Sequence, residues 1–226
     1  MDHPISSLPT ASASADGSAP TPSRFWNRRA RDYAKKPVSD EAAYERTLDR
    51  VRAHLEPNDR VLELGCGTGT TALKLANNLG ELLATDYSDE MIVIANEKAR
   101  AAGVSHVHFR TCTLDDPGLA PESFDAVLAM NLLHLLDDIP SRLARIRSLL
   151  RPGGVFISKT PCLGDQGFIL RVVVTLLRAV GRAPYVNFLR ERSLGAAIAN
   201  AGFEVLETGM YPQKSRSFFV VARLIP

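Results

Sequence analysis

The sequence of 226 residues is poor in cysteine and has no excess of charge of either sign. Its three cysteines, Cys66, Cys112 and Cys162, stand far apart and form no C-x-x-C pair, which excludes a disulfide framework and a zinc site of the usual spacing. Its 27 basic and 25 acidic residues leave a formal charge of only +2, far from the field typical of nucleic-acid binders. We therefore expect a cytoplasmic protein that holds no metal and does not bind nucleic acid.

The N-terminal part lacks the apolar run of a signal peptide, so secretion is not expected. Residues 1–23 are rich in Ser, Ala, Pro and Thr, a composition that predicts a disordered leader. Residues 24–56 are expected to form a helical cap, with a first helix over residues 28–35. A second helix is marked by an apolar stripe of Tyr44, Leu48, Val51 and Leu55. The cap and the rest of the chain make one domain over residues 24–226.

From residue 61 onward the apolar pattern alternates between short strand-like runs and helical stripes. Such alternation predicts parallel strands joined by helical crossovers, and hence a doubly wound α/β sheet. The expected strands are 61–64, 82–85, 104–109, 124–130, 155–159, 203–208 and 217–224. The expected helices are 71–79, 88–102, one from about 137, and 193–201, with a helical insertion over 162–192.

Three glycines, Gly65, Gly67 and Gly69, follow the first of these strands in the stretch VLELGCGTG. Glycine is needed where the chain takes positive φ or a ligand approaches the backbone, and a helix N-terminus offers unpaired N–H groups. The pattern therefore predicts a nucleotide-binding turn. The dinucleotide fingerprint would have Gly or Ala in place of Thr70, and Glu63 would repel a pyrophosphate. A carboxylate there suits a cationic ligand better.

Asp86 is the second signal, because it stands 21 positions after Gly65 at the predicted end of the next strand. A carboxylate there can accept hydrogen bonds from both hydroxyls of a ribose. The alternative is an aspartate that only caps the next helix. Dinucleotide enzymes share this acid, so it supports a nucleoside ligand without choosing among such ligands.

The stretch VLELGCGTG resembles the first motif of the class I S-adenosylmethionine-dependent methyltransferases, and the order of elements is similar to theirs over residues 40–225. The resemblance implies a Rossmann-like, seven-stranded, mostly parallel sheet with an antiparallel last strand beside the fifth. It also implies S-adenosyl-L-methionine as the cofactor, which carries an ammonium and a sulfonium. The cofactor-binding residues that the resemblance implies are Glu63, Gly65, Cys66, Gly67, Thr68, Gly69, Asp86, Tyr87, Ser88, Met91, Leu114, Asp115 and Asn131.

The stretch Thr113-Leu114-Asp115 departs from the family, which usually has an acid and then a small or apolar residue after the third strand. Leu114 can line an adenine, and either Thr113 or Asp115 would accept a hydrogen bond from the exocyclic amine. Cys66 is interpreted as a small residue that fits the turn rather than as a nucleophile.

The stretch Asn131-Leu132-Leu133-His134 follows the fourth strand, where a switch point opens the crevice of the sheet. Enzymes that methylate base nitrogens have an Asn/Asp-Pro-Pro-aromatic run here, and protein arginine methyltransferases have paired glutamates. This chain has neither, so the resemblance favours a small-molecule or lipid acceptor. His134 is a candidate general base or a structural histidine, and Tyr33 and Lys159 are further catalytic candidates. Methyl transfer from a sulfonium is an in-line displacement, for which positioning and exclusion of water can supply most of the acceleration.

Residues 167–182 of the insertion are too apolar for an ordinary surface helix, yet too short and too charged to span a bilayer. Their polar residues Arg171, Thr175, Arg178 and Arg182 fall on one line of a helix. Three interpretations stay open. In the first, the helix packs on the sheet or on a second copy of the chain. In the second, it covers a hydrophobic acceptor as a lid. In the third, it lies in a membrane interface with its arginines toward anionic headgroups, as in phospholipid N-methyltransferases.

Two alternatives to a methyltransferase remain at this point. An NAD-dependent Rossmann oxidoreductase is disfavoured by Thr70 and Glu63. A non-catalytic protein that binds S-adenosylmethionine would have the same motifs, so the sequence alone does not separate it from an enzyme.

Overall fold

The structure is a computed structural model that describes residues 22–211 and 217–225. A leader was expected over residues 1–23, of which residues 1–21 lie outside the described residues. Residues 22 and 23 belong to the first helix, α1, which begins at Pro22.

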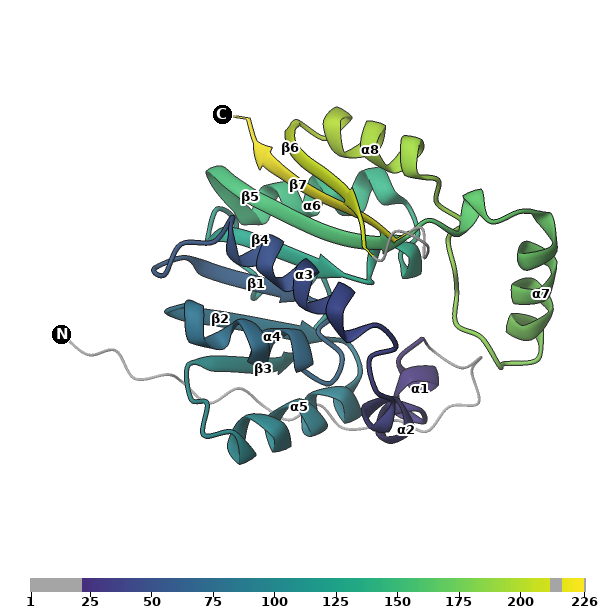
Figure 1. The fold of residues 1–226 in the computed structure, drawn as a ribbon, viewed down its shortest axis with the longest axis horizontal. Coiled ribbons are helices and arrows are strands. Elements are labelled where there is room, and N and C mark those ends of the chain that lie inside the picture. The colour runs from purple at the N-terminus through teal and green to yellow at the C-terminus, as the bar shows by residue number, and fades with distance from the viewer. Residues whose placement is uncertain (1–21, 212–216, 226) are drawn as a thin grey trace.

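Seven strands form one sheet in the order β3-β2-β1-β4-β5-β7-β6 (Figure 1). Adjacent strands from β3 to β5 are parallel, whereas β7 is antiparallel to both of its neighbours, β5 and β6. This order confirms the predicted sheet, including the antiparallel last strand beside the fifth. The bounds are β1 Arg60–Leu64, β2 Glu81–Asp86, β3 Val107–Thr111, β4 Phe124–Met130, β5 Leu150–Pro161, β6 Phe203–Met210 and β7 Ser217–Leu224.

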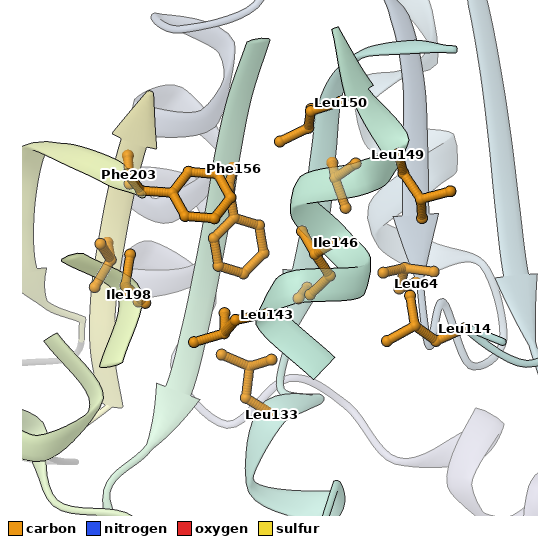
Figure 2. Packing of buried hydrophobic residues seen from close by; sticks show 14 of the residues in the cluster. Leu64, Leu114, Leu133, Leu143, Ile146, Leu149, Leu150, Phe156, Ile198 and Phe203 are labelled. Atoms are coloured by element: carbon orange, nitrogen blue, oxygen red, sulfur yellow. The ribbon is translucent and has the colours of Figure 1, made fainter. Parts of the chain in front are cut away.

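Helices cover both faces of the sheet, because alternate residues of its strands are apolar on both sides. One buried cluster joins the strands to α3, α4 and α5, and the other joins them to α6 and α8. Figure 2 shows the second cluster, in which the ring of Phe156 on β5 lies 5.7 Å from that of Phe203 on β6. The helices are α1 Pro22–Asn27, α2 Ala30–Lys35, α3 Glu41–Arg52, α4 Thr70–Leu75, α5 Asp89–Ala101, α6 Ile139–Leu149, α7 Phe168–Ala179 and α8 Glu191–Asn200. Three 3-10 turns are η1 Ala76–Asn78, η2 Leu133–Leu135 and η3 Leu163–Asp165.

Helix α5 shows how local signals set the ends of an element. The Ser88 hydroxyl accepts a hydrogen bond from the Met91 N–H at 3.3 Å, which confirms Ser88 as the predicted cap. Gly103 follows the helix with φ of +67°, as a helix stop requires. The chain then turns back, and the Val104 N–H donates to the Ala99 carbonyl at 3.0 Å. For this reason β3 begins at Val107 and not at residue 104 as predicted.

Two predicted helices differ from the structure in detail. The helix expected over residues 28–35 is α2, which begins two residues later, and α1 precedes it as a helix that was not predicted. The helix expected over residues 71–79 is α-helical only to Leu75 and continues as η1. The change at Leu75 is not marked by proline or glycine, so the sequence contained no signal for it.

Helix α7 extends away from the sheet beyond the carboxyl ends of the parallel strands (Figure 1) and buries none of its residues. The prediction that it packs on the sheet is therefore wrong. Its guanidinium groups face the returning chain, with Arg171 5.1 Å from the ring centre of Phe188 and Arg178 4.8 Å from that of Tyr185. The exposed apolar residues of this segment are Phe168, Ile169, Val172, Val173, Leu176, Leu177 and Val180.

Candidate active site

The glycine turn joins the end of β1 to the start of α4. Gly65, Gly67 and Gly69 have φ of +66°, +53° and +74°, a region that L side chains rarely adopt. Space is limiting as well, because a Cβ on Gly65 would lie 2.7 Å from Leu132 Cδ1 and one on Gly69 would lie 2.7 Å from Phe109 Cε1. The turn therefore brings backbone without side chains to the edge of the sheet.

Asp86 ends β2 beside this turn. Its Oδ2 accepts a hydrogen bond from the Gly67 N–H and its Oδ1 one from the Ser88 N–H, both at 2.9 Å. Burial raises the pKa of Asp86 above its usual value, while these backbone bonds act in the opposite direction. Each oxygen keeps a lone pair, so the carboxylate can still accept from a ligand hydroxyl.

Glu63 lies on β1 directly before the turn, and only 2% of the residue is exposed. Its Oε2 has no hydrogen-bond partner in the described part of the chain. Burial, and secondly the charge of Asp86, raises the pKa of Glu63 to about 8. A carboxyl group held largely neutral at pH 7, with a free oxygen, is suited to ionise when a cation comes next to it.

These groups open into a cavity of about 540 Å³ at the carboxyl ends of the parallel strands. A volume of this size is typical of a small-molecule site. Eleven of the predicted site residues line it: Tyr33, Glu63, Gly65, Cys66, Gly67, Thr68, Asp86, Tyr87, Met91, Asn131 and Lys159.

Four predicted cofactor residues do not line the cavity. Gly69 packs against Phe109, Ser88 caps α5, and Leu114 belongs to the buried cluster under α6. The Asp115 carboxylate pairs with the Arg142 guanidinium and is mostly exposed. The structure thus leaves the stretch after β3 without an acid in the cavity. The roles of these four stay predictions.

His134 lies in η2 and is not among the residues that line the cavity. Its Nδ1 is buried with no hydrogen-bond partner in the described residues, and burial lowers the pKa of His134 to about 4. Its backbone carbonyl accepts from the Asn187 N–H at 2.7 Å and so holds the chain returning from α7. These contacts match the structural alternative for His134 better than the role of general base.

Tyr33 and Asn131 both line the cavity near the glycine turn. Tyr33 on α2 lies beside Gly67 and is 47% exposed; partial burial of its hydroxyl, followed by the charge of Asp86, raises the pKa of Tyr33. Asn131 has φ of +57°, an uncommon conformation that asparagine tolerates better than most residues. Its N–H donates to the carbonyl of Lys159 at 2.7 Å, which joins the ends of β4 and β5.

Cys66 is buried in the turn, and burial raises the pKa of its thiol well above the usual value. The thiolate is therefore disfavoured, and Cys66 has none of the surroundings of a reactive cysteine.

Sequence reasoning missed several residues at the site. The Tyr44 hydroxyl lies 2.9 Å from the Thr71 hydroxyl, and Lys98 Nζ donates to Thr68 and Thr70 at 2.9 and 3.1 Å. Lys98 on α5 thus connects that helix to the glycine turn. Further lining residues come from α1, from the segment between α2 and α3, from β4 and η2, and from the start of β7: Trp26, Lys36, Pro37, Val38, Ser39, Asp40, Met130, Leu132, Leu135 and Ser217. Only long-range contacts bring them together.

Two further findings concern what surrounds the site. The described residues contain no group of three or more His, Cys, Asp or Glu side chains that could hold a metal ion. Within residues 22–211 and 217–225, no helix has the length and apolar content needed to cross a membrane.

Comparison with known proteins assigns the chain to a family. The family model for a methyltransferase domain matches residues 61–154, which include the glycine turn, Asp86 and Asn131. A ubiquinone biosynthesis O-methyltransferase of Xanthomonas axonopodis pv. citri is 32% identical over 190 residues, covering 80% of this chain and 76% of the relative. The chain belongs to the class I S-adenosylmethionine-dependent methyltransferases. This methyltransferase therefore uses S-adenosyl-L-methionine as its cofactor, and these relatives give no support to the nicotinamide alternative.

Solved structures agree in fold. A geranyl diphosphate C-methyltransferase from Streptomyces coelicolor A3(2), solved with S-adenosyl-L-homocysteine, superimposes with a TM-score of 0.69 at 15% identity. The match covers 89% of the present chain and 98% of the Streptomyces chain. An S-adenosylmethionine-dependent methyltransferase from Mesorhizobium loti gives a TM-score of 0.66 at 21% identity, and the match covers 81% of the present chain and 99% of the Mesorhizobium chain. At these identities the likeness concerns the fold alone.

Proposed function

We propose that this methyltransferase transfers a methyl group to an oxygen of a small, largely apolar acceptor, and that it does so at a membrane surface. The observation that carries the proposal is the combination of an exposed apolar α7 with a cavity whose apolar lining includes Met130, Leu132 and Leu135. The choice of oxygen follows the Xanthomonas relative, which is an O-methyltransferase.

The cofactor half of the cavity is assigned on its chemistry. Glu63 has a free buried oxygen for the ammonium group, and Asp86 has spare lone pairs for the ribose hydroxyls. The backbone of the glycine turn and Tyr33 line the same space. The bound cofactor supplies a methyl group already activated on a sulfonium, so the residues around it need only position the acceptor and exclude water.

Charge supports a contact between α7 and an anionic membrane. Helices α1 and α2 lie at the same end of the molecule as α7 (Figure 1), and an Arg29 guanidinium N–H donates to the Arg182 carbonyl at 3.4 Å. Cationic side chains beside an exposed apolar helix favour binding to anionic headgroups. The exposed cationic residues of α1, α2 and the chain around them are Arg24, Arg28, Arg31, Lys35 and Lys36.

The acceptor is tested with methyl-labelled cofactor and a cell extract divided into organic-soluble and aqueous fractions. We expect label in an organic-soluble small molecule, bound as an ether that resists mild acid and base. Label that enters only aqueous compounds, or that is bound to nitrogen, sulfur or carbon, contradicts the proposal.

The membrane contact is tested by flotation with vesicles of phosphatidylglycerol and phosphatidylcholine in equal parts. Ile169 and Leu176 on α7 are 80% and 63% exposed, so Ile169→Asp with Leu176→Asp should abolish flotation without disturbing the core. Val93→Asp on α5, where Val93 is 44% exposed, is the matched control and should float like the wild type. Wild-type protein that stays in the soluble fraction refutes the contact and leaves a second copy of the chain, or a lid over the acceptor, as the interpretation of α7.

A further inference from the structure

The cavity contains a lysine that the cofactor assignment does not use. Lys159 lies near the end of β5, and only 9% of the residue is exposed. Its Nζ donates a hydrogen bond to the Thr47 hydroxyl of α3 at 3.0 Å. That hydroxyl donates its own proton to the Ala43 carbonyl at 2.8 Å, so toward Lys159 it acts only as an acceptor.

Lys159 has no directly paired counterion among residues 22–211 and 217–225. Within the described residues no carboxylate oxygen comes within 4.0 Å of its Nζ, and Thr47 takes only one of its three donor hydrogens. Burial lowers the pKa of Lys159, and the more distant Asp40 offsets part of this effect. A buried ammonium without a partner is costly, whereas the same group becomes favourable once an anion lies next to it.

Lys159 lies apart from the two acidic residues assigned to the cofactor, although its backbone carbonyl accepts from the Asn131 N–H. Glu63 and Asp86 belong to β1 and β2, whereas Lys159 belongs to β5, with β4 between β1 and β5. Two strand spacings amount to about 10 Å, so Lys159 stands about that far across the cavity from Glu63, and Asp40 is the lining carboxyl group whose charge acts on Lys159. Besides Glu63, Asp86 and Lys159, the ionisable groups that line the cavity are Tyr33, Lys36, Asp40, Tyr44, Cys66 and Tyr87.

We propose that Lys159 binds the reacting oxygen of the acceptor as an anion, and that the acceptor is therefore a molecule with an acidic hydroxyl, such as a phenol. This inference rests on the proposed transfer to oxygen. The hydroxyl loses its proton to solvent on binding, and Lys159 keeps its own proton throughout. The oxygen's electron pair forms the new O–C bond as the C–S bond breaks and its pair returns to sulfur, so the products are an ether and a neutral thioether.

This binding role is tested without methyl transfer, using protein saturated with S-adenosyl-L-homocysteine and 4-nitrophenol as the probe, whose phenolate absorbs visible light. We expect the wild type to bind the phenolate and to lower the pKa of the bound phenol by about 1 to 3 units, as an opposite charge at 4–6 Å does. Lys159→Met should remove this shift and weaken phenolate binding about tenfold or more, whereas Lys159→Arg should retain most of it.

Two controls keep the result specific. The uncharged isostere 4-nitrotoluene should bind the wild type and Lys159→Met alike, and Lys74→Met, which removes a lysine outside the cavity, should bind the phenolate like the wild type. Affinity for S-adenosyl-L-homocysteine should not change in Lys159→Met.

Three results overturn the inference: no phenolate binding by the wild type, equal phenolate affinity in Lys159→Met, or a loss of S-adenosyl-L-homocysteine affinity in that variant. The last would make Lys159 a ligand of the cofactor carboxylate. If any of them occurs while label still enters an ether, only the role of Lys159 falls. If label enters nitrogen or carbon, the proposed function falls independently.

Discussion

Glu63 makes a quantitative prediction about cofactor binding. In the free protein the pKa of Glu63 is about 8, because the carboxyl group is buried and faces the charge of Asp86. The proposed contact with the cofactor ammonium requires an ionised carboxylate, since an opposite charge at short range lowers a carboxyl pKa. Binding below pH 8 should therefore release a proton, and cofactor affinity should rise with pH.

The size of the effect follows from the fraction of Glu63 that is already ionised. With a pKa of about 8, that fraction is about 1% at pH 6, about 9% at pH 7 and half at pH 8. The dissociation constant should therefore fall about ninefold from pH 6 to pH 7 and about fivefold from pH 7 to pH 8. The total is about 2.3 kcal/mol of binding free energy.

The assay is calorimetric titration with S-adenosyl-L-homocysteine at pH 6, 7 and 8, with two buffers of different ionisation enthalpy at pH 7. We expect release of close to one proton at pH 7 for the wild type and of none in excess of the ligand's own for Glu63→Gln. Titration of the ligand itself is common to both proteins, so their ratio of affinities isolates Glu63. A ratio that is constant between pH 6 and pH 8 refutes the assignment of Glu63 to the ammonium.

Three further predictions concern single side chains. Asp86→Ala should weaken S-adenosyl-L-homocysteine binding about 10- to 100-fold in calorimetry, since it removes charge-assisted hydrogen bonds of about 1.5–3 kcal/mol; unchanged affinity would reject the ribose assignment. Gly69→Ala should lower the melting temperature more than Gly103→Ala, because both glycines have positive φ but only the first would clash with its neighbours; equal losses would show that packing does not matter there. Glu207, whose pKa the Arg50 guanidinium at 2.7 Å holds below its usual 4.5, should stabilise the protein above pH 4.5 and lose that contribution as the pH falls, so the destabilisation by Glu207→Gln should shrink on acidification in thermal melts.

The sequence predicted those features that depend on neighbours in the chain. The strand, the turn with Gly65, Gly67 and Gly69, and the cap of α5 by Ser88 are all set within a few residues, and each is found where expected. The sheet order followed because alternating strands and helices allow few arrangements, and the family resemblance supplied the antiparallel β7.

Contacts between distant parts of the chain could not be predicted from the sequence. Lys159 and Thr47 are separated by 112 positions, and no local pattern indicates that they meet. The placement of His134 outside the cavity depends on how η2 turns after β4. For α7 the sequence showed a helix too apolar for solvent, but not that the sheet leaves it uncovered, because that depends on the path of the returning chain.

The charge pattern of the cavity also limits how Lys159 can act. Transfer of a methyl group from a sulfonium to an oxyanion neutralises both charges, so a cation beside the oxygen stabilises the ground state more than the transition state. Lys159 should therefore raise the ionised fraction of the bound acceptor and not accelerate the transfer itself. For a phenol that is ionised in water at the assay pH, Lys159→Met should raise KM and leave kcat unchanged or slightly higher. For a weakly acidic phenol, the same substitution should also lower kcat, and the loss should recover as the pH approaches the pKa of that phenol. Equal loss of kcat for both phenols at every pH would show that Lys159 acts in the transition state, contrary to this reasoning.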